Sequence, residues 1–420
     1  MNIPYIALIL LIGSFSGLCA DSKKERDSAI SGREEALVNS LRCLETIRGD
    51  GERIARTRCF IAENLAYLGL GQQSLSVLAE SQPHYRIPSG CVDTAMVSLG
   101  LGDSNTVKEI LNLGLDLLQF AVGRGADVIQ FQILKMGTVC GDAGIVQRAL
   151  DSEKLTQVNL SQSYQIFLQD FKPNLWNMIL DRFFPDRHWV MLQDKATREK
   201  EISWAAERSV DYFSALLFLR QAEAQCRSGK SFPSTWTVFA HAGVRAAAIN
   251  TRPANLSAEL AALALIQQQF LVAVEHVKRT WKLLGEWAPQ MSGIYKIERD
   301  LALVLAALPE AVTLQEEAKM RIGKRYQIMQ TSLQPFELMQ SLPLIAEAFH
   351  VLKADQEAQE AWKQAADLCA LNQNPESQSI GLARIWMSYA RANTLPNKET
   401  EMSLQKTEKQ LPAAYSKVKF

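Results

Sequence analysis

The stretch LPLIAEAFHVLKADQEAQEAWKQAADL, residues 342–368, contains two short apolar stripes with the spacing of amphipathic helices. Apolar residues recur three and four positions apart in 342–349 and again in 358–365. Residues 353–355 interrupt the pattern, and Asp355 stands where its side chain could accept the first free amides of a second helix. The stretch therefore predicts a helical hairpin, whose small residues let the two helices pack closely.

The same stretch resembles a tetratricopeptide repeat. The family pattern of a large residue, an aliphatic–small pair, an aromatic, and then an alanine, an aromatic and an alanine is matched by Leu342, Ile345, Ala346, Phe349, Ala358, Trp362 and Ala365. Two family positions differ, since Lys353 replaces a glycine and Ala370 replaces a proline. Weaker copies centre on Ala261, Ala302 and Ala383, and the small residues of successive copies lie 37 to 44 positions apart, against about 34 in the family. The resemblance implies an all-α fold, an α/α superhelix or solenoid of degenerate hairpins that binds a protein or peptide on its concave surface.

Glycines mark predicted turns in the N-terminal half. Gly71, Gly102 and Gly141 each stand between two apolar helical patterns, so we expect the chain to leave a helix there through a left-handed residue, which suits glycine. In the C-terminal copies, Gln268 and Lys353 stand at this position. The GxG pairs nearby lack the preceding strand and the third glycine of a dinucleotide-binding loop, so they predict helix ends rather than a nucleotide site.

The chain begins with an uncharged apolar run, residues 3–18, followed by Cys19 and Ala20 and then a charged segment. The run is short for a membrane span, which needs about 20 residues, and Ala20 suits signal peptidase. We therefore predict a cleaved signal peptide over 1–20 and a secreted or periplasmic protein. An uncleaved membrane anchor formed by residues 3–18 and a lipid attached to Cys19 are the alternatives.

The composition restricts the class of partner. The chain carries 45 basic and 45 acidic residues, and this balance disfavours a general binder of nucleic acid or of anionic membranes. Hydrophobic residues make up 47% of the chain, enough for a folded core. No second run of 18 or more apolar residues follows the first, so the sequence predicts no membrane span after the signal is removed.

Two cysteines flank a predicted turn at residues 48–51. Cys43 and Cys59 lie at comparable distances on either side of this turn, so an antiparallel hairpin could place them at the same height, as a disulfide requires. The alternative is two buried thiols packed as small apolar residues. The cysteines form no CxxC pair and no metal-like cluster, so no metal site is predicted.

Residues 161–250 depart from the hairpin pattern and are rich in aromatic side chains, which predicts an irregular helical connector. A candidate site lies in this segment, where Asp186, His188 and Trp189 place a carboxylate, a titratable ring and an aromatic surface just after a proline. The alternative interpretation is the start of a helix, with Asp186 as its cap and Trp189 packed inward.

Motifs of catalysis are not found in the sequence. The five histidines are dispersed without an HExxH arrangement, and no GxSxG motif occurs. Glu347, Glu357 and Glu360 fall on predicted polar helix faces, where we expect them to be solvated. No catalytic residue, cofactor or metal is therefore predicted.

These observations divide the chain into a signal peptide (1–20), an N-terminal helical-repeat region (21–160), the connector (161–250) and a C-terminal repeat region (251–420). The predicted function is a non-catalytic, extracytoplasmic scaffold or adaptor for a protein or peptide partner, without nucleic acid. The alternative is an extracytoplasmic α/α-fold enzyme acting on polysaccharide, for which two acids about 5 to 10 Å apart in a cleft would be the sign.

Overall fold

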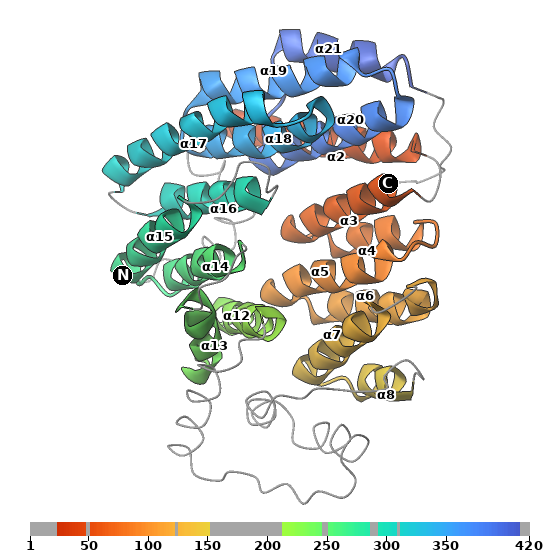
Figure 1. Cartoon of the computed structure of the whole chain (residues 1–420), viewed down its shortest axis with the longest axis vertical. Coiled ribbons are helices and arrows are strands. Elements are labelled where there is room, and N and C mark those ends of the chain that lie inside the picture. The colour runs from red at the N-terminus through yellow and green to blue at the C-terminus, as the bar shows by residue number, and fades with distance from the viewer. Residues whose placement is uncertain are drawn as a thin grey trace, which may run out of the picture. The chain divides into compact units, whose positions relative to one another are not determined.

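The computed structural model describes residues 23–47, 51–121, 125–151, 212–245, 251–285, 293–308 and 311–411. Within these ranges it contains seventeen α-helices, one short 3-10 helix and no β-strand (Figure 1). The prediction of an all-α fold is therefore confirmed. The predicted signal peptide (1–20) and a large part of the predicted connector lie outside the described residues, and so do Asp186, His188 and Trp189.

The described helices fall into two compact units. The central unit, Asp50–Gln267, contains α3 (Glu52–Tyr67), α4 (Gly71–Ala79), α5 (Arg86–Gly100), α6 (Ser104–Leu117), the 3-10 helix η2 (Leu118–Phe120), α7 (Gly125–Cys140), α8 (Ala143–Asp151), α12 (Tyr212–Arg227), α13 (Thr235–Arg245) and α14 (Arg252–Ile266). The terminal unit combines Met1–Gly49 with Gln268–Phe420 and contains α2 (Lys23–Glu45), α15 (Phe270–Leu284), α16 (Gly293–Ala307), α17 (Val312–Ser332), α18 (Pro335–Val351), α19 (Asp355–Leu371), α20 (Pro375–Ala392) and α21 (Lys398–Glu408).

In the central unit, successive helices pair into hairpins. The pairs α3–α4, α5–α6, α7–α8 and α12–α13 pack against each other. The first helices α3, α5 and α7 lie side by side, as do the second helices α4, α6 and α8, so the hairpins form two layers (Figure 1). Helix α12 packs against α14 and also against α5 and α7, which joins the later hairpins to the earlier ones through their first helices. We refer to the first helices of the hairpins as the first-helix layer.

The terminal unit is built in the same way, with α16, α18 and α20 in contact and α19 packed against α21. The N-terminal helix α2 packs along α20 and extends the first-helix layer of this unit. Ser40 Oγ donates to the Ala383 carbonyl at 2.8 Å, and the hydroxyls of Thr46 and Ser379 lie 2.7 Å apart. The sequence prediction placed this helix in the region 21–160. The structure instead groups it with the C-terminal hairpins, because α2 packs along α20.

Residues with positive φ angles follow seven of the helices. They are Gly69, Gly102, Gly141, Gly229, Gln268, Lys353 and Asn393, at the ends of α3, α5, α7, α12, α14, α18 and α20. After α5, the Gly102 N–H donates to the Leu99 carbonyl and the Asp103 N–H donates to the Ser98 carbonyl, both at 3.0 Å. These two bonds satisfy carbonyl groups that the end of the helix leaves open. The predicted left-handed turn is therefore confirmed at Gly102 and at Gly141.

The prediction is wrong for Gly71, because the left-handed residue of that hairpin is Gly69, two positions earlier. Gly71 is instead the first residue of α4. A Cβ atom added to it would lie 2.4 Å from Thr106 Oγ1 and 2.8 Å from Asp103 Oδ2. Glycine is needed there because the start of the next second helix approaches too closely for any side chain.

Replacing Gly102 with alanine is expected to lower the free energy of unfolding by about 1 kcal/mol. Its φ angle is 82°, and no atom lies within 4 Å of an added Cβ, so the effect is backbone strain alone. The left-handed conformation costs alanine about 1–2 kcal/mol, partly offset by the smaller entropy of its unfolded chain. Gly323→Ala is the matched control, since Gly323 lies inside α17 with equally open space, and it should stabilise by about 0.5–1 kcal/mol. Chemical denaturation followed by helical circular dichroism measures both, and equal effects would contradict the strain argument.

The hairpin predicted from residues 342–368 consists of α18 and α19, with Trp362 at its centre. The Trp362 side chain is fully buried, and its ring stacks on that of Tyr389 from α20, with centroids 4.4 Å apart. Trp362 Nε1 donates to Ser388 Oγ at 2.8 Å, and this hydroxyl donates to the Pro343 carbonyl at 2.9 Å. One side chain therefore joins α18, α19 and α20.

Asp355 does not cap α19, contrary to the sequence prediction. The N-cap position is Ala354, and Asp355 is the first residue of the helix. The Asp355 carboxylate lies 3.0 Å from His350 Nδ1 at the end of α18, so it links the two helices across their turn.

The six described cysteines, Cys43, Cys59, Cys91, Cys140, Cys226 and Cys369, are free thiols. Cys43 is buried in the terminal unit, whereas Cys59 Sγ occupies the space beside Gly90 of α5, 2.1 Å from where a Cβ of that residue would lie. Burial raises the pKa of both thiols, that of Cys59 to about 12. Cys43 belongs to the terminal unit and Cys59 to the central unit, and each thiol packs inside its own unit, so the Cys43–Cys59 disulfide stays a prediction.

Candidate functional site

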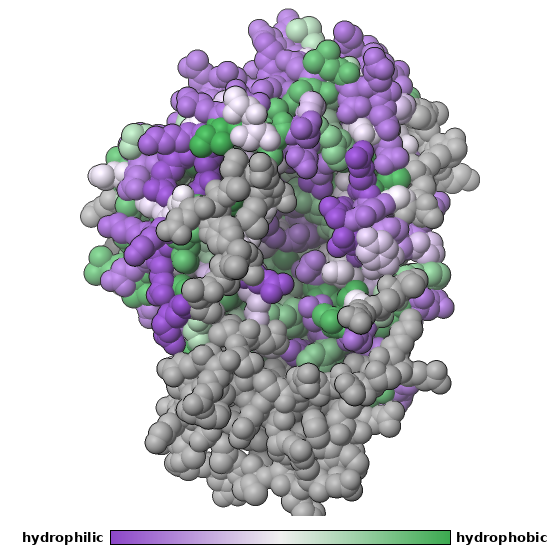
Figure 2. Space-filling model, viewed as in Figure 1, coloured by the Kyte–Doolittle hydropathy of each residue, from purple (hydrophilic) through white to green (hydrophobic). Residues whose placement is uncertain are grey.

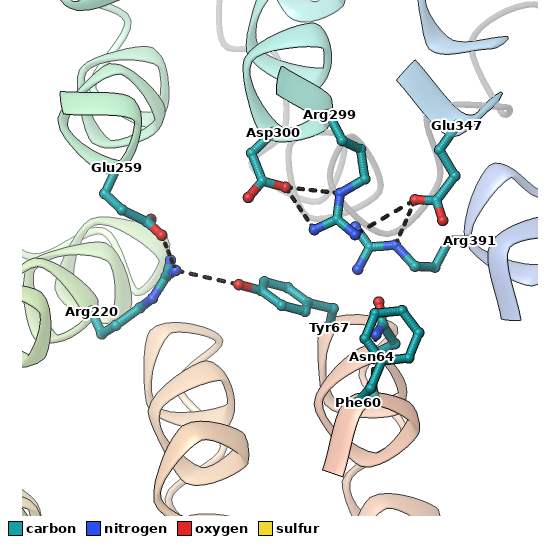
Figure 3. Close-up of polar contacts among 9 residues, drawn as sticks. All are labelled: Phe60, Asn64, Tyr67, Arg220, Glu259, Arg299, Asp300, Glu347 and Arg391. Carbon is teal, nitrogen blue, oxygen red and sulfur yellow. Dashed lines mark hydrogen bonds and ion pairs between the residues drawn. The ribbon is translucent and has the colours of Figure 1, made fainter. Parts of the chain in front are cut away.

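Charged side chains from three first helices of the terminal unit meet in one place (Figure 3). We call Arg299 and Asp300 of α16, Glu347 of α18 and Arg391 of α20 the terminal charge cluster. Arg299 donates to Asp300 Oδ1 through Nε at 3.0 Å and through Nη2 at 2.8 Å. Arg391 Nε donates to Glu347 Oε2 at 3.0 Å, and Arg299 Nη1 lies 3.7 Å from the same oxygen. Glu347 is therefore shared by two guanidinium groups from different helices.

Three of the four side chains of the terminal charge cluster are almost entirely removed from solvent. The exposed fractions of the side chains are 2% for Arg299, 5% for Glu347 and 10% for Arg391. Asp300 is the most accessible member, at 27%. Burial favours its neutral form, but the positive charges of Arg299, Lys296 and Arg391 outweigh this and hold the pKa of the Asp300 carboxyl below its usual value. Two guanidinium and two carboxylate groups balance within the cluster, which makes burial of the charges tolerable.

A second ion pair connects the neighbouring helices α16 and α17. Arg325 of α17 donates through Nε to Glu298 Oε1 of α16 at 2.6 Å, and the Glu298 side chain is only 1% exposed. Arg325 Nη2 also donates to the Leu284 carbonyl at the end of α15 at 2.9 Å. One turn earlier, Arg321 Nη2 donates to the Trp281 carbonyl at 3.1 Å. Arg325 thus supplies a donor to a carbonyl in the last turn of α15, and Arg321 adds a second donor to the Trp281 carbonyl, which already accepts from the Gly285 N–H at 3.0 Å.

The central unit has its own buried charge cluster, which consists of Arg220 and Glu223 of α12, Glu259 of α14 and Tyr67 of α3. Arg220 Nη1 donates to Glu223 Oε2 at 2.7 Å. Its Nη2 donates to Glu259 Oε1 at 2.6 Å and to the Tyr67 hydroxyl at 3.4 Å (Figure 3). Burial opposes the charge of the guanidinium, but the two carboxylates hold the pKa of Arg220 well above its usual value. A Cβ on Gly100 would lie 2.7 Å from Glu223 Oε2 and 2.8 Å from Arg220 Cδ, so this cluster fits against α5 only because residue 100 is a glycine.

Asp300 should make stability depend on pH in the acid range. Its folded-state pKa lies below its unfolded one, so its contribution is fully present above about pH 4 and is lost as the pH falls through the lower, folded value. Denaturation midpoints measured from neutral pH into this range should fall more steeply for the native chain than for Asp300→Asn. Equal slopes for the two chains would show that Asp300 is not held in its ionised form by the cluster.

Both clusters are suited to ion pairing. The pKa values of four described carboxyl groups, those of Glu52, Asp142, Asp300 and Glu399, are shifted downward. A general acid for glycoside cleavage needs a shift in the opposite direction. Carboxylates held ionised by arginines can position charge and recognise polar groups, which is binding chemistry.

Glu347 is the functional candidate that the sequence prediction missed. It was expected to be solvated together with Glu357 and Glu360, and those two are exposed, but the structure leaves only 4% of Glu347 accessible. The signal that could have identified Glu347 is the apolar sequence on both sides of it. Positions 338–349 of α18 are apolar on nearly every side of the helix, which is typical of a helix buried all round. A carboxylate in such a helix needs a buried cationic partner.

Among the described residues, no cluster of His, Cys, Asp and Glu has the geometry to hold a metal ion. No helix in the same part of the chain combines the length and the apolar character that crossing a membrane requires. Comparison with models of known protein families, with curated proteins and with solved structures finds no match for this chain.

Proposed function

We propose that the protein is a non-catalytic, extracytoplasmic scaffold whose degenerate tetratricopeptide-like hairpins form a superhelix that binds a protein or peptide partner on the first-helix layer. The observation that carries the proposal is the terminal charge cluster, because it places buried charges on three successive first helices, α16, α18 and α20. Buried ion pairs are poor stabilisers compared with apolar packing. Their presence along one layer is better explained by recognition of a partner or by holding the hairpins in register for it.

The expected partner is a polar, extended segment. Stacked hairpins present many side chains along a line, so affinity is spread over a long surface. Asp300 has the most exposed side chain of the cluster, at 27%, and the neighbouring positive charges favour its ionised form. A basic or hydrogen-bond-donating group of the partner would meet it favourably.

The test is a pull-down from an envelope extract of the source organism, with the chain lacking residues 1–20 as bait and mass spectrometry of the retained proteins. Asp300→Lys reverses charge on the first-helix layer, while Glu360→Lys reverses it on the exposed surface of α19 and serves as the matched control. A protein retained by the native chain and by Glu360→Lys, but lost with Asp300→Lys, would support the proposal. Retention of glycans alone would overturn it in favour of a polysaccharide-acting protein, and Asp186, His188 and Trp189 would then be the residues to substitute.

A further inference from the structure

The exposed face of α15 begins with three apolar side chains. Leu271 is 82% exposed, and Phe270 and Val272 are each 40% exposed. They follow the turn formed by Gln268, whose φ is 59°, and Gln269, the N-cap of α15. Three consecutive apolar residues at the tip of a turn form a contiguous patch, unlike the isolated exposed residues that most protein surfaces carry.

The same face continues as a basic surface. Leu271, Glu275, Lys278 and Lys282 lie three and four positions apart and therefore share one stripe of the helix, with Arg279 beside it. Lys278, Arg279 and Lys282 are exposed, and within the described part of the chain none of them forms an ion pair. Glu275 is the single acidic residue on this stripe, so α15 presents a local excess of positive charge next to an apolar tip.

We propose that this face of α15, Phe270 to Lys282, docks on an anionic lipid surface. The apolar residues 270–272 enter the boundary between head groups and acyl chains, and Lys278, Arg279 and Lys282 lie against the anionic head groups. A purely acidic chain such as polyglutamate would satisfy the three positive charges but would leave Leu271 exposed to water. An anionic lipid surface covers the apolar residues 270–272 and also carries negative charges that pair with Lys278, Arg279 and Lys282.

The neutral composition of the chain is compatible with this proposal. The argument from 45 basic and 45 acidic residues concerns the whole sequence, whereas attraction to a surface depends on charges within about a Debye length of it. In Figure 2 hydrophilic and hydrophobic residues alternate over short distances on the visible surface. A local basic face can therefore exist on a chain without net charge.

The experiment is flotation of the full chain with two kinds of vesicle, one of phosphatidylcholine and one of phosphatidylcholine mixed with phosphatidylglycerol. Because residues 3–18 are apolar and can enter either vesicle, the readout is the ratio of binding to anionic over neutral vesicles. We expect K278Q/R279Q/K282Q to lower this ratio by about a hundredfold, at about fivefold for each charge removed. Leu271→Ser should weaken binding to anionic vesicles, and hydrogen exchange at 270–273 should slow when these vesicles are added to the native chain.

The matched control is K398Q/K406Q/K409Q, which removes three exposed lysines from α21 and its C-terminal end, where Glu399 and Glu401 offset them. This variant should keep the ratio of the native chain. If it loses as much as the α15 variant, net charge alone explains the binding and the proposal fails. The proposal is also overturned if polyglutamate binds the native chain through the same three basic residues with no effect of Leu271→Ser, because the partner would then be an acidic polypeptide.

Discussion

Trp362→Ala is expected to lower the free energy of unfolding by about 3–5 kcal/mol, the range for deleting a fully buried aromatic side chain. Three contributions add here. The indole is completely buried, it stacks on Tyr389, and its Nε1 donates to Ser388, whose hydroxyl bonds Pro343. Since these residues belong to α18, α19 and α20, the substitution leaves a cavity where three helices meet, and alanine restores none of the contacts.

Chemical denaturation followed by circular dichroism measures this loss. Trp362→Phe separates the contributions, because it keeps a ring against Tyr389 but leaves Ser388 without its donor, and about 1–3 kcal/mol should be lost. Leu371→Ala removes a side chain of α19 that is 78% exposed and should change stability by less than about 0.5 kcal/mol. A Trp362→Ala effect as small as that of Leu371→Ala would show that the hairpins do not pack around this indole.

Glu347→Gln is expected to lower the free energy of unfolding by about 3–5 kcal/mol, as breaking a buried ion pair does. Glutamine has nearly the same shape, so the change is chiefly the loss of charge. Glu347 Oε2 accepts a hydrogen bond from Arg391 Nε at 3.0 Å and lies 3.7 Å from Arg299 Nη1. Without its carboxylate, two guanidinium groups of low exposure share Asp300 as the remaining acid of the cluster, and desolvation of their charge is no longer compensated.

Glu360→Gln on the exposed face of α19 is the control and should be nearly neutral. A double-mutant cycle of Glu347→Gln with Arg391→Gln then isolates the pair, and we expect a coupling of more than about 1 kcal/mol. If the two substitutions had additive effects on the free energy of unfolding, the interaction between Glu347 and Arg391 would contribute nothing to stability.

Local sequence was sufficient where a feature depends on neighbours along the chain. The apolar stripes of residues 342–368 predicted α18 and α19, because helical contacts three and four positions apart can be read directly from a sequence. The turn positions at Gly102 and Gly141 were predicted for the same reason, since a left-handed residue at a helix end is a local requirement. The prediction of the turn residue was wrong at Gly71 because Gly69 stands only two positions before it. Only the packing of Gly71 against Asp103 and Thr106 distinguishes the roles of the two glycines.

The sequence by itself determined that the described part of this chain is all-α and where the hairpins at Gly102 and Gly141 turn. Only the tertiary structure decided which helices share an interface: α2 joins α20 across most of the chain length, and Glu347 meets Arg299 and Arg391 from two other helices. The physical reason is the distance along the chain between the residues that interact. Helix formation and turns depend on residues within a few positions, whereas burial of a charge, pairing of distant helices and the state of Cys43 and Cys59 depend on partners that no local pattern identifies.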